Sequence, residues 1–176
     1  MSARRDPDAP VFLVGFMGAG KSTAGRALAA RWGWAFEDTD ALVERREGRA
    51  VETIFRDSGE GRFREAEWEV LRSLEGRARV VVATGGGLFL GVAQRAFVRA
   101  HGVSCWLDAP LAVVAARVGA GASRPLWPAD DALSRRAFFE RRRAAYALAD
   151  LRVDASRGGA DELASAIETA RRSLWR

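Results

Sequence analysis

Residues 15–22 read Gly-Phe-Met-Gly-Ala-Gly-Lys-Ser, which fits the phosphate-binding pattern G-x-x-x-x-G-K-[ST]. An uninterrupted apolar run, Val11–Val14, precedes this loop and is typical of a parallel strand buried on both faces. A helical pattern over residues 22–32 follows it, and Gly33 stands where such a helix would stop. A strand followed by a glycine-rich loop and a helix places the backbone N–H groups of the helix N-terminus where they can hold a phosphate.

Lys21, inside this loop, is the only lysine among 28 basic residues. A compact ammonium on a thin stem can reach between phosphate oxygens as a point charge, whereas a guanidinium is planar and forked. The Ser22 hydroxyl is a suitable ligand for Mg²⁺. The loop therefore predicts a nucleoside triphosphate with magnesium, and the alternative is a chance match in a glycine-rich turn.

Five apolar runs alternate with helical patterns along the chain. The runs span residues 11–14, 35–37, 80–83, 103–107 and 151–153. Strands separated by helices predict βαβ units and a five-stranded parallel sheet with helices on both faces, so we expect an α/β fold. In such a sheet, ligands bind beyond the carboxyl ends of the strands.

The length of 176 residues predicts a single domain over residues 1–176. Residues 1–9 are polar, without the apolar segment of a secretory signal, and we expect them to be flexible. Residues 118–131 are rich in glycine and proline, so they are expected to form either a mobile lid over a triphosphate or an ordinary connecting loop. The lone Cys105 and the lack of a long apolar run favour a cytoplasmic protein that does not cross a membrane.

The net charge of +5 allows three interpretations: a nucleic-acid partner, a pocket for small anions, or a compositional bias toward arginine. The arginines are scattered through helical segments with acidic residues between many of them. The sequence shows no basic stripe interleaved with aromatic residues. We therefore expect compositional bias together with an anionic site, and no nucleic-acid partner.

Three further features could complete a site at the carboxyl edge of the sheet. Asp38 and Asp40 follow the second strand and would project to the same side if that strand continued, although Thr39 or Asp40 could instead open the next helix as its N-cap. Arg64, on a strongly helical stretch, could grip a carboxylate bidentately or simply be a solvated arginine. Residues 85–87 are three consecutive glycines. Their cost in conformational entropy would have to be offset by a close approach of a ligand or by positive φ angles.

Taken together, these motifs closely resemble those of the shikimate kinase family. The matching segments are residues 15–23, 38–40, 54–55, 59–60, 63–65, 85–87 and 124–126, in order and at similar spacing, so that the resemblance covers roughly residues 10–172. The resemblance implies a P-loop fold like that of nucleoside-monophosphate kinases, with a mobile lid. It also implies transfer of the ATP γ-phosphoryl group to the 3-hydroxyl of shikimate, with ATP and Mg²⁺ as cofactors. The alternatives are another P-loop small-molecule kinase and a non-catalytic metabolite-binding module.

The resemblance also assigns roles to residues of this chain. The residues implied for ATP are Gly18, Ala19, Gly20, Lys21, Ser22, Thr23, Arg117, Arg124 and Arg157. Those implied for shikimate are Asp40, Arg64, Gly85, Gly86, Gly87 and Arg142, and those for Mg²⁺ are Ser22 and Asp38. Lys21, Asp40 and Arg124 are implied as the catalytic residues. We expect the enzyme to act as a monomer.

One departure from the family pattern concerns the second arginine that would bind the substrate carboxylate. The family usually shows R-x-P-x-Y at this place, whereas residues 141–146 read Arg-Arg-Arg-Ala-Ala-Tyr. Counting back from Tyr146 selects Arg142, with Ala144 in place of the proline, whereas counting back from Asp150 selects Arg141. We take Arg142 as the prediction.

Overall fold

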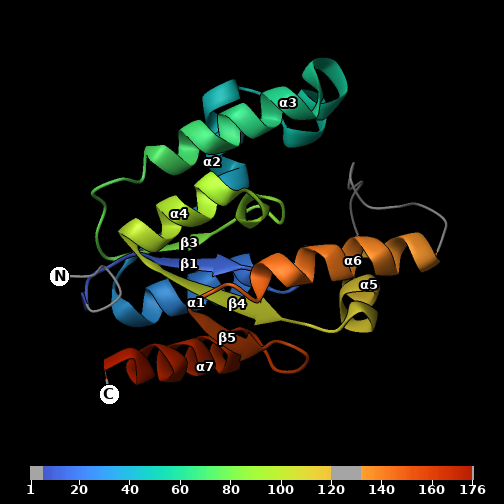
Figure 1. Ribbon diagram of the computed structural model, residues 1–176. Helices are drawn as coiled ribbons and strands as arrows, with labels where there is room; N and C mark the ends of the chain where they lie inside the picture. Colours follow the sequence, from blue (N-terminus) through green and yellow to red (C-terminus); the bar gives the residue numbers. More distant parts are fainter. Residues whose placement is uncertain (1–5, 120–131, 176) are drawn as a thin grey trace.

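Five parallel strands form the centre of the molecule, in the order β2-β3-β1-β4-β5 (Figure 1). The computed structural model describes residues 6–119 and 132–175. The strands are β1 (Val11–Val14), β2 (Ala35–Asp38), β3 (Val80–Ala83), β4 (Val103–Asp108) and β5 (Leu151–Asp154). In the middle of the sheet, Val11 of β1 is in register with Val81 of β3 and Val103 of β4. The predicted five-stranded parallel sheet is confirmed.

Helices cover both faces of this sheet. They are α1 (Lys21–Trp32), α2 (Thr39–Glu47), α3 (Val51–Arg72), η2 (Leu88–Leu90), α4 (Val92–His101), α5 (Leu111–Gly119), α6 (Ala132–Tyr146), α7 (Ala160–Arg172) and η3 (Ser173–Trp175). Helices α1 and α7 pack together on one face, and α4 and α6 lie across the other (Figure 1). All four residues of β1 are fully buried between the layers, as an uninterrupted apolar run predicts. Gly33, at φ 65°, ends α1 at the predicted stop.

Helices α2 and α3 form a second, smaller layer beside the β2–β3 side of the sheet (Figure 1). Val43 of α2 packs with Ile54 and Phe63 of α3 in a small hydrophobic cluster of its own. Helix α3 is broken at Gly59, where φ is 77° and ψ is 173°. This break divides α3 into two helical segments, and it lies close to Arg64.

The ends of the chain come together through Arg171 of α7. Its guanidinium donates hydrogen bonds to the carbonyl oxygens of Pro7 (2.7 Å) and Ala9 (3.2 Å). It also lies over the rings of Trp32 and Trp34, 4.9 and 4.8 Å from their centroids. Residues 6–9 belong to the segment expected to be flexible; among them, Ala9 is buried.

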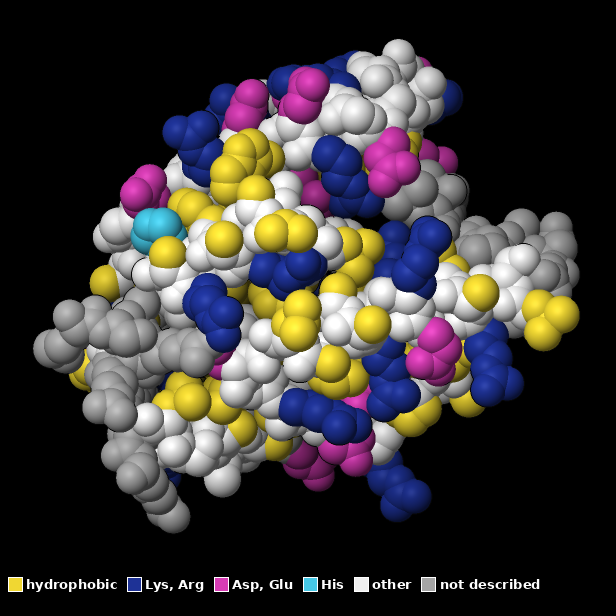
Figure 2. All heavy atoms as spheres, viewed as in Figure 1, with side chains coloured by type: hydrophobic (Ala, Val, Ile, Leu, Met, Phe, Trp, Pro, Cys, Tyr) yellow, Lys and Arg dark blue, Asp and Glu magenta, His cyan; other side chains and the backbone are white. Residues whose placement is uncertain are grey.

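Basic and acidic side chains are interspersed on the face shown in Figure 2 rather than gathered into one basic stripe. Several arginines pair with carboxylates, for example Arg45 with Glu37 (2.9 Å) and Arg46 with Glu69 (2.8 Å). Within residues 6–119 and 132–175, no helix has the length and apolar character that crossing a membrane requires. Residues 120–131, which include Arg124 and most of the expected lid, lie outside the described residues.

Candidate active site

The phosphate-binding loop joins β1 to α1. Gly15 (φ 140°) and Gly20 (φ 92°) adopt backbone angles that favour glycine, and a Cβ on Gly15 would lie only 2.7 Å from the Leu107 carbonyl oxygen. Lys21 is buried, and its Nζ donates to the carbonyl oxygens of Gly15 (2.9 Å) and Phe16 (2.8 Å). The ammonium group is therefore held along the inner side of the loop, where the sequence predicts a phosphate.

Asp38, at the end of β2, connects this loop to α2. Its Oδ2 accepts a hydrogen bond from Ser22 Oγ (2.6 Å), and its Oδ1 accepts the backbone N–H of Asp40 (3.0 Å). Asp38 is thus the N-cap of α2, whereas the sequence analysis considered Thr39 and Asp40 for that position. The strand does not continue through Asp40 as one alternative assumed. Helix α2 begins at Thr39, and its first turn carries Asp40 into the cleft.

A hollow of about 230 Å³ opens above the loop and is lined by Lys21, Ser22, Thr23, Asp38 and Asp40 together with Gly18, Gly20 and Gly86. The hydroxyl of Ser22 and the carboxylate of Asp38 are hard oxygen donors of the kind that Mg²⁺ prefers. In the described part of the chain, no group of three or more His, Cys, Asp or Glu side chains gathers to hold a metal ion. Two protein oxygens beside a phosphate loop fit Mg²⁺, because this ion usually completes its coordination with water and substrate phosphates.

A second hollow of about 80 Å³ adjoins the first. It is lined by Asp40, Arg64, Glu67, Gly85, Gly86, Gly87 and Arg142, with Val51, Phe55 and Phe63 from α3 and Met17 from the loop. All six residues predicted for the acceptor lie in this one place, although they come from α2, α3, α6 and the turn after β3. The two hollows share Met17, Asp40 and Gly86.

Each glycine of the turn after β3 faces a different polar side chain of the acceptor hollow. A Cβ on Gly85 would lie 2.6 Å from Asp40 Oδ1, and one on Gly87 would lie 2.5 Å from both terminal nitrogens of Arg64. A Cβ on Gly86 would lie 3.5 Å from a terminal nitrogen of Arg142. None of the three has a positive φ. Close approach of side chains, not backbone conformation, therefore accounts for Gly85 and Gly87, whereas a Cβ on Gly86 would make ordinary van der Waals contact.

The three consecutive arginines of α6 point in three directions, because successive residues on a helix are about 100° apart. Arg142 is buried in the acceptor hollow, with its guanidinium 4.1 Å from the ring centroid of Phe138. Arg141 is exposed and lines only the outer hollow that adjoins the acceptor hollow, and Arg143 forms an ion pair with Asp108 (3.1 Å). Of the two arginines that the sequence left open, the geometry favours Arg142.

Tyr146 and Thr39 fix the glycine turn from two sides. The Tyr146 hydroxyl, one helical turn beyond Arg142, donates a hydrogen bond to the Gly86 carbonyl oxygen, and burial raises the pKa of Tyr146 to about 12. Thr39 is fully buried, and its Oγ1 accepts the backbone N–H of Gly85 (2.7 Å). Neither contact follows from a local sequence pattern, because each joins segments that are far apart in the chain.

Glu67 is a buried carboxyl group that the sequence analysis did not single out. Its Oε2 accepts a hydrogen bond from Arg64 (2.8 Å), and its Oε1 faces Gly85, where a Cβ would lie 2.6 Å away. Burial raises the pKa of Glu67 to about 7, the charge of Asp40 adds to this rise, and the ion pair with Arg64 opposes it. Burial therefore makes Glu67 easier to protonate than an exposed glutamate.

Replacing Glu67 with glutamine is expected to raise the Tm at pH 8 and to leave it almost unchanged at pH 4.5. The pKa of Glu67 is higher in the folded protein than its ordinary value of 4.5, so the native state binds more protons between pH 4.5 and about 7. The wild type loses stability as the pH rises through this window, whereas the amide does not titrate. A gain of 1 kcal/mol corresponds to about 2–4 °C in a chain of this size. Thermal unfolding without ligands measures the effect, and an equal Tm difference at both pH values would contradict it.

The third hollow, about 340 Å³, lies beside the phosphate loop and is lined by Gly18, Gly20, Thr23, Arg117, Gly158, Gly159, Ala160 and Leu163. Arg117 donates hydrogen bonds to the carbonyl oxygens of Gly18 (3.2 Å) and Ala155 (3.4 Å). This position suits a base attached to a triphosphate in the loop. Arg157 is exposed on the adjoining turn but does not line the hollow, and Arg124 lies outside the described residues.

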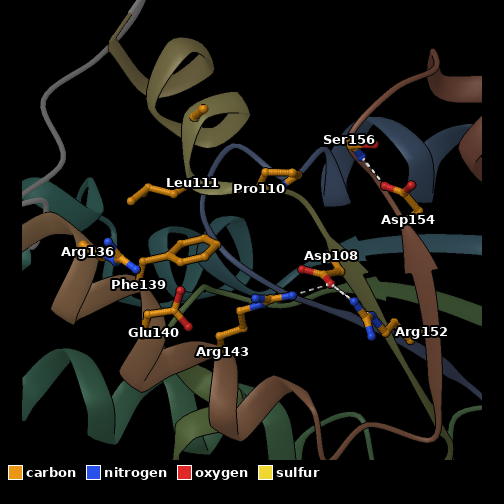
Figure 3. A pocket seen from close by; sticks show the side chains of 11 residues that line it. Asp108, Pro110, Leu111, Arg136, Phe139, Glu140, Arg143, Arg152, Asp154 and Ser156 are labelled. Atoms are coloured by element: carbon orange, nitrogen blue, oxygen red, sulfur yellow. Dashed lines mark hydrogen bonds and ion pairs between the residues drawn. The ribbon is translucent and has the colours of Figure 1, made fainter.

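A larger hollow, about 900 Å³, lies between α5, α6 and the ends of β4 and β5 (Figure 3). Arg143 and Arg152 point toward Asp108 there and form ion pairs with its Oδ2. None of the residues predicted for the active site lines it. Its size alone therefore does not make it the site of the chemistry.

Comparisons with known proteins agree with this geometry. The sequence model of the shikimate kinase family matches residues 17–171. A shikimate kinase of Microcystis aeruginosa is 44% identical over 144 residues, which cover 81% of this chain and 75% of that protein. The shikimate kinase of Geobacter sulfurreducens is 42% identical over 162 residues, covering 90% of this chain and 88% of its own.

Solved structures show the same similarity in three dimensions. A shikimate kinase from Acinetobacter baumannii, solved in complex with shikimate, superposes with a TM-score of 0.89 at 33% identity and covers 95% of this chain and 94% of its own. The enzyme from Aquifex aeolicus superposes with a TM-score of 0.85 at 32% identity, covering 95% and 99% of the two chains. The resemblance seen in the sequence motifs is confirmed, and this chain belongs to the shikimate kinase family.

Proposed function

We propose that this protein transfers the γ-phosphoryl group of ATP to the 3-hydroxyl of shikimate, giving shikimate 3-phosphate and ADP. The observation that carries the proposal is the shared wall of two hollows. Asp40, Gly86 and Met17 line both the hollow above the phosphate loop and the hollow that contains Arg64 and Arg142. A phosphate donor in the first hollow and a small hydroxy acid in the second would therefore meet at Asp40.

The phosphate loop supplies the donor side of the reaction. Its backbone N–H groups and Lys21 would hold the phosphates and stabilise the negative charge on the transferring group. Ser22 and Asp38 would hold Mg²⁺, which neutralises phosphate charge when it is bound. We assign the base of the nucleotide to the hollow beside Arg117. The roles of Arg124 and Arg157 toward the phosphates and the base remain proposals that rest on the family pattern.

Two arginines and one carboxylate supply the acceptor side. Arg64 and Arg142 would bind the substrate carboxylate, and Asp40 would accept a hydrogen bond from the attacking hydroxyl group. As the bond from this oxygen to phosphorus forms, the bond from phosphorus to the β,γ-bridging oxygen breaks, and the hydroxyl proton passes late to Asp40. Phosphoryl transfer has a loose transition state, so alignment of the two substrates supplies a large part of the rate, about 7 kcal/mol or more of the barrier.

The surface charges and the phosphate loop also bear on a nucleic-acid partner and on a non-catalytic role. On the face shown in Figure 2, the interspersed arginines and carboxylates support an enzyme without a nucleic-acid partner. We also propose that it acts as a cytoplasmic monomer. A non-catalytic metabolite-binding module would have no need of Lys21, Ser22 and Asp38 assembled beside an acceptor hollow. A gel shift with duplex DNA and with RNA at physiological salt tests the nucleic-acid alternative.

The decisive experiment for the proposed function measures ADP release by the purified protein with ATP, Mg²⁺ and shikimate. We expect ADP release that requires shikimate and stops when the divalent cation is chelated with EDTA. Controls without acceptor, and with gluconate in its place, distinguish shikimate kinase activity from hydrolysis of ATP and from another small-molecule kinase. The absence of shikimate-dependent ADP release would overturn the proposal.

A further inference from the structure

Arg64, the residue assigned to the substrate carboxylate, is already bound by two carboxylates of its own helix. One terminal nitrogen donates to Glu67 Oε2 (2.8 Å), whereas Nε and the other terminal nitrogen both donate to Glu60 Oε1 (3.2 and 3.0 Å). Gly87 approaches the terminal nitrogens so closely that a Cβ there would lie 2.5 Å from each. The side of the guanidinium formed by Nε and a terminal nitrogen can hold a carboxylate at two points, and Glu60 occupies it.

The two carboxylates are held very differently. The Glu67 side chain is 3% exposed, whereas that of Glu60 is 54% exposed. An ion pair with an exposed carboxylate contributes little, about 0–1 kcal/mol, because water solvates that carboxylate when the pair separates, although the Arg64 side chain is itself only 29% exposed. Glu60 can therefore leave Arg64 at low cost, whereas separating Glu67 from Arg64 would leave a buried charge without its partner.

Glu60 also acts on the second arginine of the acceptor site. Glu60, Arg64, Arg141 and Arg142 line the outer hollow, about 630 Å³, which adjoins the acceptor hollow along Arg64, Glu67, Gly87 and Arg142. Burial lowers the pKa of Arg142, and the positive charge of Arg64 lowers it further. Tyr146 opposes this lowering most strongly, and Glu60 opposes it to a smaller extent. Glu60 thus provides the negative charge that a substrate carboxylate would bring to the same two guanidinium groups.

The backbone next to Glu60 interrupts the helix. Gly59, immediately before it, has non-helical angles, and a Cβ at that position would meet nothing within 4 Å. Glu60 therefore stands at the start of the second helical segment of α3, with the break on one side and Arg64 one turn away on the other. Its carboxylate can swing away from Arg64 without disturbing the first segment of α3.

We propose that Glu60 is an internal counterion of the acceptor site, which the carboxylate of the substrate displaces from Arg64. Glu60 reduces the repulsion between Arg64 and Arg142 while the site is empty. It thereby weakens the binding of an acidic acceptor by the free energy needed to break its own ion pair. This inference rests on the proposed function, since it specifies how the acceptor site selects a carboxylate.

The experiment compares Glu60→Gln with Glu65→Gln in steady-state kinetics at low salt. Both variants remove one negative charge from α3, but the Glu65 side chain is 70% exposed and contacts Arg62 (3.4 Å) instead of Arg64. We expect Glu60→Gln to lower the KM for shikimate about two- to fivefold, with kcat and the KM for ATP unchanged. We expect Glu65→Gln to leave all three constants near those of the wild type.

A neutral ligand distinguishes the counterion role of Glu60 from a purely structural role. A structural role would change the binding of the acid and of a neutral analogue alike. The carboxamide of shikimate has no negative charge to exchange for that of Glu60, so its inhibition constant should not improve in Glu60→Gln. A raised or unchanged KM for shikimate, an equal change in Glu65→Gln, or an equal gain for acid and carboxamide would each overturn the inference. If the wild type shows no shikimate-dependent ADP release, the proposed function itself fails. An active wild type combined with any of the overturning results would refute only the role of Glu60.

Discussion

Replacing Lys21 with methionine is expected to lower kcat by about 10²- to 10³-fold, the effect of removing one preorganised group that stabilises charge in a transition state. The Nζ of Lys21 lies inside the loop, bonded to the carbonyl oxygens of Gly15 and Phe16, where an uncharged side chain cannot replace it. The KM for shikimate should change much less, because the acceptor hollow does not include Lys21. Steady-state kinetics at saturating ATP with varied shikimate measure both constants.

Lys21→Arg serves as the matched variant for this prediction. It keeps the positive charge, but a forked guanidinium does not fit a site shaped for a compact ammonium, so we expect it not to restore kcat. Circular dichroism and the Tm check that each variant is folded. A folded methionine variant that retains most of the wild-type kcat would show that Lys21 does not act in the transition state.

Replacing Gly85 with alanine is expected to reduce kcat/KM for shikimate by about 10²-fold or more. The added methyl group would lie 2.6 Å from Asp40 Oδ1 and 2.6 Å from Glu67 Oε1, so both carboxyl groups would have to move. A displacement of about 1 Å in aligned catalytic groups can cost about 10²-fold in rate. Gly85 has no positive φ, so the substitution adds no backbone strain and its effect reports on the crowded side chains.

Gly61→Ala is the control for a glycine-to-alanine change on the same side of the molecule. Nothing lies within 4 Å of a Cβ at Gly61, so the expected activity is that of the wild type. Its helical position should make the protein slightly more stable, by about 1 kcal/mol at most. Wild-type kinetics in a folded Gly85→Ala variant would show that Asp40 and Glu67 tolerate displacement.

Local patterns in the sequence were sufficient to predict the sheet and the phosphate loop. Val11–Val14 is buried on both faces as an uninterrupted apolar run requires, and Gly33 ends α1 because it can adopt a positive φ. The glycine turn lies at the acceptor hollow because it follows β3 at the carboxyl edge of the sheet, whereas Arg64 and Arg142 reach the hollow from helices α3 and α6. The sheet and the phosphate loop follow from short-range patterns, whereas the acceptor residues were assigned by the resemblance to the shikimate kinase family.

Contacts between distant segments could not be predicted in this way. Glu67 stands in a helix rich in charged residues, and its burial appears only when α3 packs beside Asp40 and Gly85. The choice between Arg141 and Arg142 required the rotation of α6 about its own axis, since a shift of one residue changes the face by about 100°. The N-cap of α2 depends on where β2 ends. The spacing of Asp38 and Asp40 by two residues could not show that the strand ends at Asp38.

Lys21 also makes the protein unusual toward reagents that react with amines. It carries the only side-chain primary amine of the chain, and this amine is bonded to two carbonyl oxygens within the loop. Acylating reagents, aldehyde crosslinkers and enzymes that modify lysine therefore find no amine on any of the other side chains, because all the remaining basic residues are arginines. Acylation of this lysine would coincide with loss of the phosphate site, so the fraction of molecules modified at Lys21, separated by peptide mapping from modification of the α-amino group, would report on how many molecules are inactivated.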